Sequence, residues 1–252
     1  MTPRLLPCLF LTLLACTPGS SAFAEDSSPA QQSGSEFTWS DTATAGSSVR
    51  LSNVHGDVQL VSSKDKTIRV RATKSGRDAE LAEVIVETVG DDVNIRTKLP
   101  EGRKHNRSTD VRVNYVVEVP AGIAFNANVV SGNIHARGID GPLDLEAVSG
   151  NIDAAGSGDL RVTTVSGNAT VELPAGSRRA MLEAVNGSLE VSVPTSLGLD
   201  LAATSINGRI QSEVTHERTT KLVGSEVRIS RGDRAATVRL ETVNGAIQIR
   251  NG

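Results

Sequence analysis

The stretch FNANVVSGNIHARGIDGPLDLEAVSGNIDAAGSGDLRVTTVSGNAT, residues 125–170, contains the feature that decides the fold. Within it the tripeptide Val-Ser-Gly occurs three times, at regular intervals along the chain. A fixed interval of this kind indicates a repeated structural unit. Working outward, the same pattern continues with Asn-Gly or His-Gly in place of Ser-Gly. The turn glycines predicted in this way are Gly56, Gly132, Gly150, Gly167, Gly187, Gly208 and Gly245.

Apolar residues alternate with polar ones before each of these turns. Counting back by twos from Ser149 gives Ala147, Leu145 and Leu143, and Ile152 follows the turn. Alternation with a period of two indicates a β-strand. Glycine tolerates positive φ, and serine or asparagine bonds to nearby backbone, so Ser-Gly and Asn-Gly are typical of tight turns. Each unit is therefore predicted to be a strand, a tight turn and a shorter strand.

Two all-β architectures fit this pattern, and both leave little room for helix. If each dipeptide closes a two-residue hairpin, the flanking strands pair and the chain forms an antiparallel meander or sandwich. If each unit is one coil, the chain forms a β-solenoid, a stack of short strands similar to a right-handed β-helix. Val148, Val165, Val185 and Ile206 then stack as a ladder. The recurrence of one residue type at one place in every unit favours the solenoid.

The interval between the last two turn glycines is longer than the others. It is about two units long, and Gly224 lies in a degenerate turn between Gly208 and Gly245. The sequence therefore predicts one further, imperfect unit in this interval.

The N-terminus predicts a secretory signal peptide. Arg4 precedes a short apolar run, and an Ala-x-Ala motif ends at Ala24, directly before Glu25. This order of segments is typical of a signal peptide that is cleaved between Ala24 and Glu25. An alternative is lipidation of Cys16, because the preceding Leu-Leu-Ala resembles a lipobox. A lipid on Cys16 would anchor the protein to a membrane.

Four regions are predicted along the chain. They are a signal peptide at 1–24, a flexible linker of small polar residues at 25–35, an N-terminal β-strand region at 36–120 and the β-strand repeat at 121–252.

Composition excludes several classes of function. Both cysteines lie within residues 1–24, so the processed chain has no disulfide, thiol nucleophile or thiolate metal site. The formal charge of −3 becomes −4 without this segment, which contains one arginine and no acid. A mildly acidic chain lacks the basic stripe that nucleic acids need. No aromatic residue occurs from residue 126 onward, which excludes an aromatic-lined groove in the repeat.

Titratable residues do not form a recognisable catalytic motif. The four histidines lack the spacing of metal ligands, although two of them, His55 and His135, flank turns and could share a metal. The serines of the turns lack the surroundings of a nucleophile elbow. No catalytic, metal or cofactor-binding residue is predicted, and no cofactor is expected.

A polysaccharide-active enzyme is the strongest catalytic alternative. Asp140, Asp144, Asp153 and Arg161 would form a patch if they lay on adjacent coils, and glycosidases use paired carboxylates. Acidic residues at strand edges also prevent aggregation without any catalysis.

The order of these parts resembles a bacterial domain family of unknown function described as a putative adhesin, with repeated strands and Asn-Gly-Asp-type turns. The resemblance covers residues 36–252, although three turns here are Ser-Gly. It implies a β-solenoid-like fold, an envelope or surface setting, and no catalytic residues. The matching stretches are SVRLSNVHGDVQL (48–60), DDVNIRTKL (91–99), YVVEVPAGIAFNANVVSGNI (115–134) and LETVNGAIQIRNG (240–252).

These observations predict an exported, non-catalytic structural or adhesive protein of the cell envelope. It would bind a protein or glycan of the envelope through an extended surface. The expected location is the periplasm or the cell surface, or the outer membrane as a lipoprotein if Cys16 is processed; no transmembrane span and no nucleic-acid partner are expected. The alternatives are a polysaccharide-active β-helix enzyme and a periplasmic accessory subunit of an envelope signalling system.

Overall fold

The structure is a computed structural model, and it describes residues 28–44, 46–99, 109–214, 217–220 and 224–252. These residues form β-strands and one turn of 3₁₀ helix, η1 (Ala79–Leu81), with no α-helix among them. No helix in the described part of the chain is long and apolar enough to cross a membrane. The predicted signal peptide, with Ala24, Glu25 and Cys16, lies outside the described residues.

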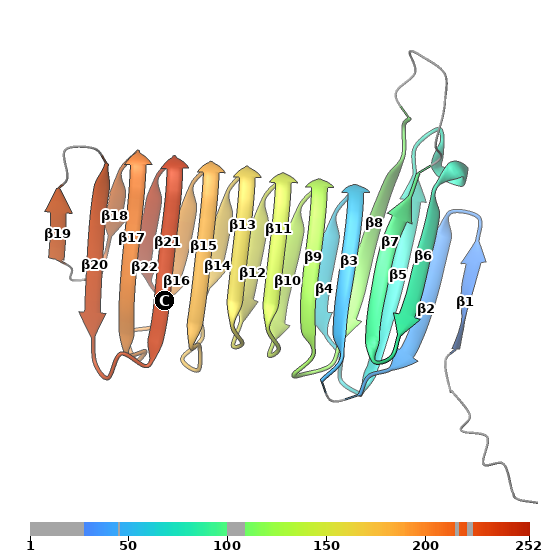
Figure 1. Ribbon diagram of the computed structural model, residues 1–252, viewed down its shortest axis with the longest axis horizontal. Coiled ribbons are helices and arrows are strands. Elements are labelled where there is room, and N and C mark those ends of the chain that lie inside the picture. The colour runs from blue at the N-terminus through green and yellow to red at the C-terminus, as the bar shows by residue number, and fades with distance from the viewer. Residues whose placement is uncertain (1–27, 45, 100–108, 215–216, 221–223) are drawn as a thin grey trace, which may run out of the picture.

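The strands form two sheets of eleven strands each, which the ribbon view shows one behind the other (Figure 1). The first sheet has the spatial order β1 (Ser28–Ser33), β2 (Glu36–Thr42), β5 (Thr67–Ser75), β8 (Arg112–Val119), β4 (Val58–Ser62), β10 (Ile134–Ile139), β12 (Ile152–Gly156), β14 (Ala169–Glu172), β16 (Leu189–Val193), β22 (Ile247–Asn251) and β18 (Ile210–Ser212).

The second sheet faces the viewer in Figure 1 over the repeat. Its spatial order is β19 (Glu217–Thr220), β20 (Ser225–Arg231), β17 (Leu199–Asn207), β21 (Ala236–Asn244), β15 (Arg179–Asn186), β13 (Leu160–Ser166), β11 (Leu143–Ser149), β9 (Ala124–Ser131), β3 (Ser48–His55), β7 (Asp92–Lys98) and β6 (Glu83–Val89).

The turn dipeptides connect the two sheets. Strand β11 belongs to the second sheet and β12, which follows Gly150, belongs to the first. The hairpin interpretation is therefore wrong for these turns, because the strands that flank a turn do not pair. Equivalent strands of neighbouring units pair instead, in parallel and in register, so that Ser149 aligns with Ser131 on one side and with Ser166 on the other. The all-β prediction is confirmed.

The core lies between the sheets and follows the alternation seen in the sequence. Leu143, Leu145 and Ala147 of β11 are buried, and so are Ile152 and Ala154 of β12. Because units pair in register, each buried side chain packs against its equivalents in the neighbouring units. Burying one such aliphatic side chain contributes about 1.5–3 kcal/mol. One continuous rung consists of Leu51, Ala127, Leu145, Val162, Leu182, Leu240 and Ala203.

The units are not stacked in sequence order at the C-terminal end. Strand β21 lies between β15 and β17, and β22 lies between β16 and β18. The imperfect unit predicted around Gly224 is also absent from the described residues. In its place, β20 runs antiparallel to β17 and β19 runs antiparallel to β20.

Antiparallel strands complete the N-terminal end. In the first sheet β2 and β8 both pair with β5, and in the second sheet β6 pairs with β7. Ser28–Ser33, which lie within the predicted linker at 25–35, form β1 and pair with β2. Backbone groups supply this pairing, so small polar residues do not prevent it.

A candidate interaction surface on the second sheet

Six aliphatic residues form an exposed row across the second sheet, which we call the aliphatic row. Each is the residue directly before a turn dipeptide, and each is 36–49% exposed. They lie near the strand ends marked by the upper arrowheads in Figure 1. In spatial order the row consists of Val130, Val148, Val165, Val185, Val243 and Ile206.

The position of these residues follows from strand geometry. Val148 is adjacent to the buried Ala147, and successive side chains of a strand point to opposite faces. The predicted stacking of Val148, Val165 and Val185 agrees with the pairing of β11, β13 and β15. Ile206 does not follow Val185 directly, because β21 places Val243 between them. With strands about 4.8 Å apart, the row is about 24 Å long.

The exposure of this row was not predicted from the sequence. The alternation in the sequence could have predicted it. Within a strand, a residue an odd number of positions from a buried side chain faces away from the core. Single exposed aliphatic residues are normal, but a contiguous apolar patch on a soluble domain commonly marks a site of interaction.

Polar side chains border the aliphatic row on the strand side. Each of these side chains lies two positions before a residue of the row, and they are aligned on adjacent strands: Asn128, Glu146, Thr163, Glu183, Glu241 and Thr204. The guanidinium of Arg161 lies 3.4 Å from the carboxylate of Glu183. An apolar strip with a polar border has the layout of a protein interface, in which an apolar centre has a polar rim.

A shallow cavity of about 400 Å³ lies farther along the same face, where β3, β9, β11 and β13 begin. Arg50, Asn126, Asp144 and Arg161 contribute to its lining. Asn126 donates to one carboxylate oxygen of Asp144 at 3.2 Å, while the other oxygen is buried without a hydrogen-bond partner. This depression has both polar and apolar residues in its lining and lies on the same outer face as the aliphatic row.

The four residues of the predicted acidic patch do not come together. Asp144 and Arg161 are cross-strand neighbours in the second sheet. Asp153 lies in the first sheet, where its carboxylate pairs with Arg137 at 2.6 Å. Asp140 accepts a hydrogen bond from the hydroxyl of Ser157 at 2.7 Å. The geometry of a two-carboxylate glycosidase site is therefore not formed by these residues.

His55 and His135, the two histidines within the described residues, do not form a pair either. His55 aligns with Ser131 in the second sheet, whereas His135 aligns with Gln59 in the first. His105 and His216 lie outside the described residues. Within the described ranges, no group of three histidine, cysteine or acidic residues could hold a metal ion.

The turn glycines form a column beside the aliphatic row. The N–H of Gly150 donates to the carbonyl of Ser166 at 3.0 Å, and equivalent bonds link the other units. A Cβ atom on Gly150 would overlap the carbonyl oxygen of Gly132, and a Cβ on Gly187 would overlap that of Gly167. Gly56 has a positive φ of 125°, which favours glycine, but Gly187 does not have a positive φ. Close packing between units therefore explains why glycine occurs at both kinds of turn.

A second column of polar side chains follows the glycines. Asn133, Asn151 and Asn168 come directly after turn glycines, and they are not among the residues predicted from the sequence. The N–H of Asn151 donates to the side-chain oxygen of Asn133 at 3.0 Å, and Asn168 donates to Asn151 in the same way. Asp57 begins this column and Ser188 ends it. The tripeptide Ser-Gly-Asn occurs three times in the sequence, and this repetition could have indicated the column.

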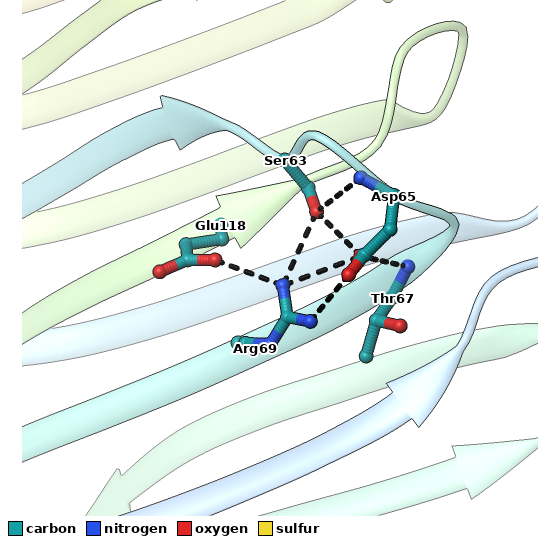
Figure 2. Close-up of polar contacts among 5 residues, drawn as sticks. All are labelled: Ser63, Asp65, Thr67, Arg69 and Glu118. Atoms are coloured by element: carbon teal, nitrogen blue, oxygen red, sulfur yellow. Dashed lines mark hydrogen bonds and ion pairs between the residues drawn. The ribbon is translucent and has the colours of Figure 1, made fainter.

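A charged cluster stabilises the connection between β4 and β5 (Figure 2). Arg69 pairs with Asp65 at 2.5 Å and with Glu118 at 3.1 Å. Asp65 also accepts hydrogen bonds from the backbone of Thr67 and from the hydroxyl of Ser63. The hydrogen bonds from Arg69, and then those from Thr67 and Ser63, hold the pKa of Asp65 well below its ordinary value.

A polar network lies inside the N-terminal end. The hydroxyl groups of Tyr115 and Thr97 are 2.7 Å apart, and Thr97 donates to the side-chain oxygen of Asn53 at 3.0 Å. Burial raises the pKa of Tyr115 to about 12, and the hydrogen bond with Thr97 opposes this rise. The network is internal and is separated from the aliphatic row.

Comparison with known proteins gives weak likenesses only. No family model and no curated protein matches the chain. Among solved structures, a putative cell adhesion protein from Clostridium sporogenes is 14% identical with a TM-score of 0.44, over 85% of this chain and 99% of that one. A putative adhesin from Bacteroides fragilis is 14% identical with a TM-score of 0.29, over 87% and 98%. A putative adhesin from Parabacteroides merdae is 8% identical with a TM-score of 0.28, over 86% and 96%.

Proposed function

We propose that this protein is a non-catalytic structural or adhesive module of the cell envelope, which binds a protein or glycan partner through the outer face of its second sheet. The aliphatic row carries this proposal. Its six exposed side chains lie in one line and have a polar border. Folding leaves 36–49% of each of these residues exposed to water, so apolar surface remains that a partner could cover.

The fold supports this role through its stiffness. We infer that residues 121–252 form a β-solenoid, because equivalent strands of neighbouring units pair in parallel and in register. The N-terminal region at 36–120 contributes β3 and β4 to the same two sheets. A stack held by continuous ladders keeps the aliphatic row straight, so a partner can make many weak contacts at once.

Export is the second part of the proposal. The A-x-A motif before Glu25 supports cleavage after Ala24 and release into the periplasm or to the cell surface. Processing at Cys16 would instead produce an outer-membrane lipoprotein. The intact mass of the purified exported protein distinguishes these two forms directly.

The binding role is tested by changing valine to threonine in the row. The variant Val148→Thr/Val165→Thr/Val185→Thr keeps the branched shape and the strand propensity while it replaces a methyl group with a hydroxyl. The matched control is Val61→Thr/Val116→Thr, on the outer face of the first sheet.

Each protein is immobilised and used to capture partners from solubilised envelope proteins and from an array of envelope glycans. We expect the row variant to lose at least about tenfold of the specific capture and the control to retain it, since each lost apolar contact weakens binding. Equal capture by wild type and row variant would contradict the proposal. Cleavage of any glycan by the wild-type protein would contradict its non-catalytic part.

A further inference from the structure

The last described unit of the chain occupies an unexpected place. We call β21 and β22, residues 236–251, the C-terminal unit. It lies between β15 and β16 on one side and β17 and β18 on the other, although these neighbours follow one another in the sequence. The chain therefore inserts its final segment into a slot formed by two earlier units.

The contacts of the C-terminal unit come from both walls of this slot. Val238 aligns with Ala180 of β15 and with Leu201 of β17. The side-chain amide of Asn244 donates to Asn186 at 2.8 Å and accepts from Asn207 at 2.9 Å. The buried apolar side chains of the unit are Ala236, Val238, Leu240, Ile247 and Ile249, and the side chain of Thr242 is buried with them.

The unit makes no strand pair with β20, which directly precedes it in the chain. Strand β17 lies between β20 and β21, so the connecting residues must pass beneath it, across two strand spacings or about 10 Å. Figure 1 shows this connection at the lower end of the second sheet. Arg231 holds it in place by donating to the backbone carbonyls of Pro194 and Leu197, at 2.7 and 3.1 Å.

The connection adopts a strained backbone. Gly232 has a φ of 62°, and Arg234 has a φ of 55°. Among the described residues, Arg234 is the only non-glycine residue with positive φ. This left-handed conformation is unfavourable for a residue with a Cβ atom, so the connection would relax if it were extended.

From this geometry we propose that the C-terminal unit is exchangeable, and that two copies of this chain form a dimer by inserting their C-terminal units into each other's slots. Val238 and Asn244 make these contacts with strands of other units, so a second copy can supply the same contacts in trans. Extending Arg234 removes the strain that the closed monomer imposes. Short, strained connections favour such exchange.

A cross-linking experiment on the full chain tests the exchange. In a Cys8→Ser/Cys16→Ser background, one chain carries Met181→Cys and a second, larger tagged chain carries Arg239→Cys. These residues are aligned neighbours on the outer faces of β15 and β21, within reach of a disulfide. The two chains are unfolded together, refolded at high protein concentration and oxidised.

Exchange places one cysteine of each chain side by side, so we expect a disulfide-linked heterodimer. The control pair is Glu146→Cys with Thr163→Cys, aligned neighbours on β11 and β13, whose units follow each other directly in sequence and space. We expect at least about tenfold less heterodimer from the control pair. Equal yields from the two pairs would overturn the proposal.

A second test needs no cysteine. Arg234→Gly removes the strain of the closed connection, whereas the β-branched side chain of Arg234→Val increases it. After refolding at equal concentration, size-exclusion chromatography should give about fivefold less dimer than wild type for the glycine variant and more dimer for the valine variant. Equal dimer fractions in all three proteins would overturn the proposal. The Val148→Thr/Val165→Thr/Val185→Thr protein should dimerise as wild type does, which separates exchange from association through the aliphatic row.

Discussion

The carbonyl oxygen of Gly132 lies against the Cα atom of Gly150, and no Cβ atom fits between the two residues. The same relationship recurs from unit to unit, so that Gly167 lies against Gly150 and Gly187 lies against Gly167. The spacing of strands in the sheet is constant, and these turns therefore cannot move apart to admit a side chain. The units can pair in register only if their turns pack this closely.

Gly187→Ala should lower stability strongly for this reason. The added methyl group overlaps the carbonyl oxygen of Gly167, and we expect a loss of about 2–3 kcal/mol, within the range of overpacked sites. Gly176→Ala is the matched control, because a Cβ atom there meets nothing within 4 Å. Thermal and urea unfolding measure both variants. A midpoint for Gly187→Ala equal to that of Gly176→Ala would contradict the role assigned to the turn glycines.

Asn151→Ala should have a smaller, measurable effect. It removes the side-chain oxygen that accepts the N–H of Asn168 at 3.0 Å, an exposed hydrogen bond, and one hydrogen bond contributes about 0.5–1.5 kcal/mol. Asn94→Ala, on the outer face of β7, serves as the control and should stay within about 0.5 kcal/mol of wild type. Urea unfolding distinguishes the two. If both variants unfold alike, the asparagine column does not stabilise the stack.

Tyr115 should titrate at a pH well above the ordinary value for tyrosine. Its pKa is raised to about 12 in the folded protein, whereas an unfolded chain has a tyrosine pKa of about 10. Because the unfolded state releases this proton first, stability is retained below pH 10 and lost as the pH rises toward 12. The chain contains one tyrosine, so tyrosinate absorbance reports this group alone. Titration of the folded protein near pH 10, as in concentrated urea, would refute the assignment.

Asp65 should contribute to stability at neutral pH and not in strong acid. Its pKa is lowered chiefly by the hydrogen bonds from Arg69, so the folded state favours the ionised form. A lowered pKa stabilises the protein above the unfolded value of about 3.9, and this contribution is lost as the pH falls further. Asp65→Asn should therefore lower the melting temperature at pH 7, and the difference from wild type should shrink below pH 3.

The control for this prediction is Asp200→Asn, which changes an exposed carboxylate on β17. Its melting temperature should follow that of wild type across the whole range. A difference between Asp65→Asn and wild type that does not depend on pH would show that the charge of Asp65 is not what stabilises the connection between β4 and β5.

The alternation around each turn was sufficient to predict which residues face the core. Ala147, Leu145 and Leu143 are buried as their spacing indicates, and the strands end at the predicted Ser-Gly and Asn-Gly dipeptides. The same alternation also predicts that Val148 is exposed. Ala147 faces the core, so the next side chain along the strand faces outward. These features are local, because a side chain's face depends only on its position along its own strand.

The sequence by itself therefore determined the strands, the turns and the inner and outer faces, but not which units are neighbours. All units present similar aliphatic rungs and similar Xaa-Gly turns, and Asn186 and Asn207 both align with Asn244, so the repeat is compatible with more than one stacking order. Only the tertiary structure placed β21 between β15 and β17 and brought Val243 into the row between Val185 and Ile206. Pairing between strands is decided by the packing of whole units, and a pattern that repeats along the chain does not encode that choice.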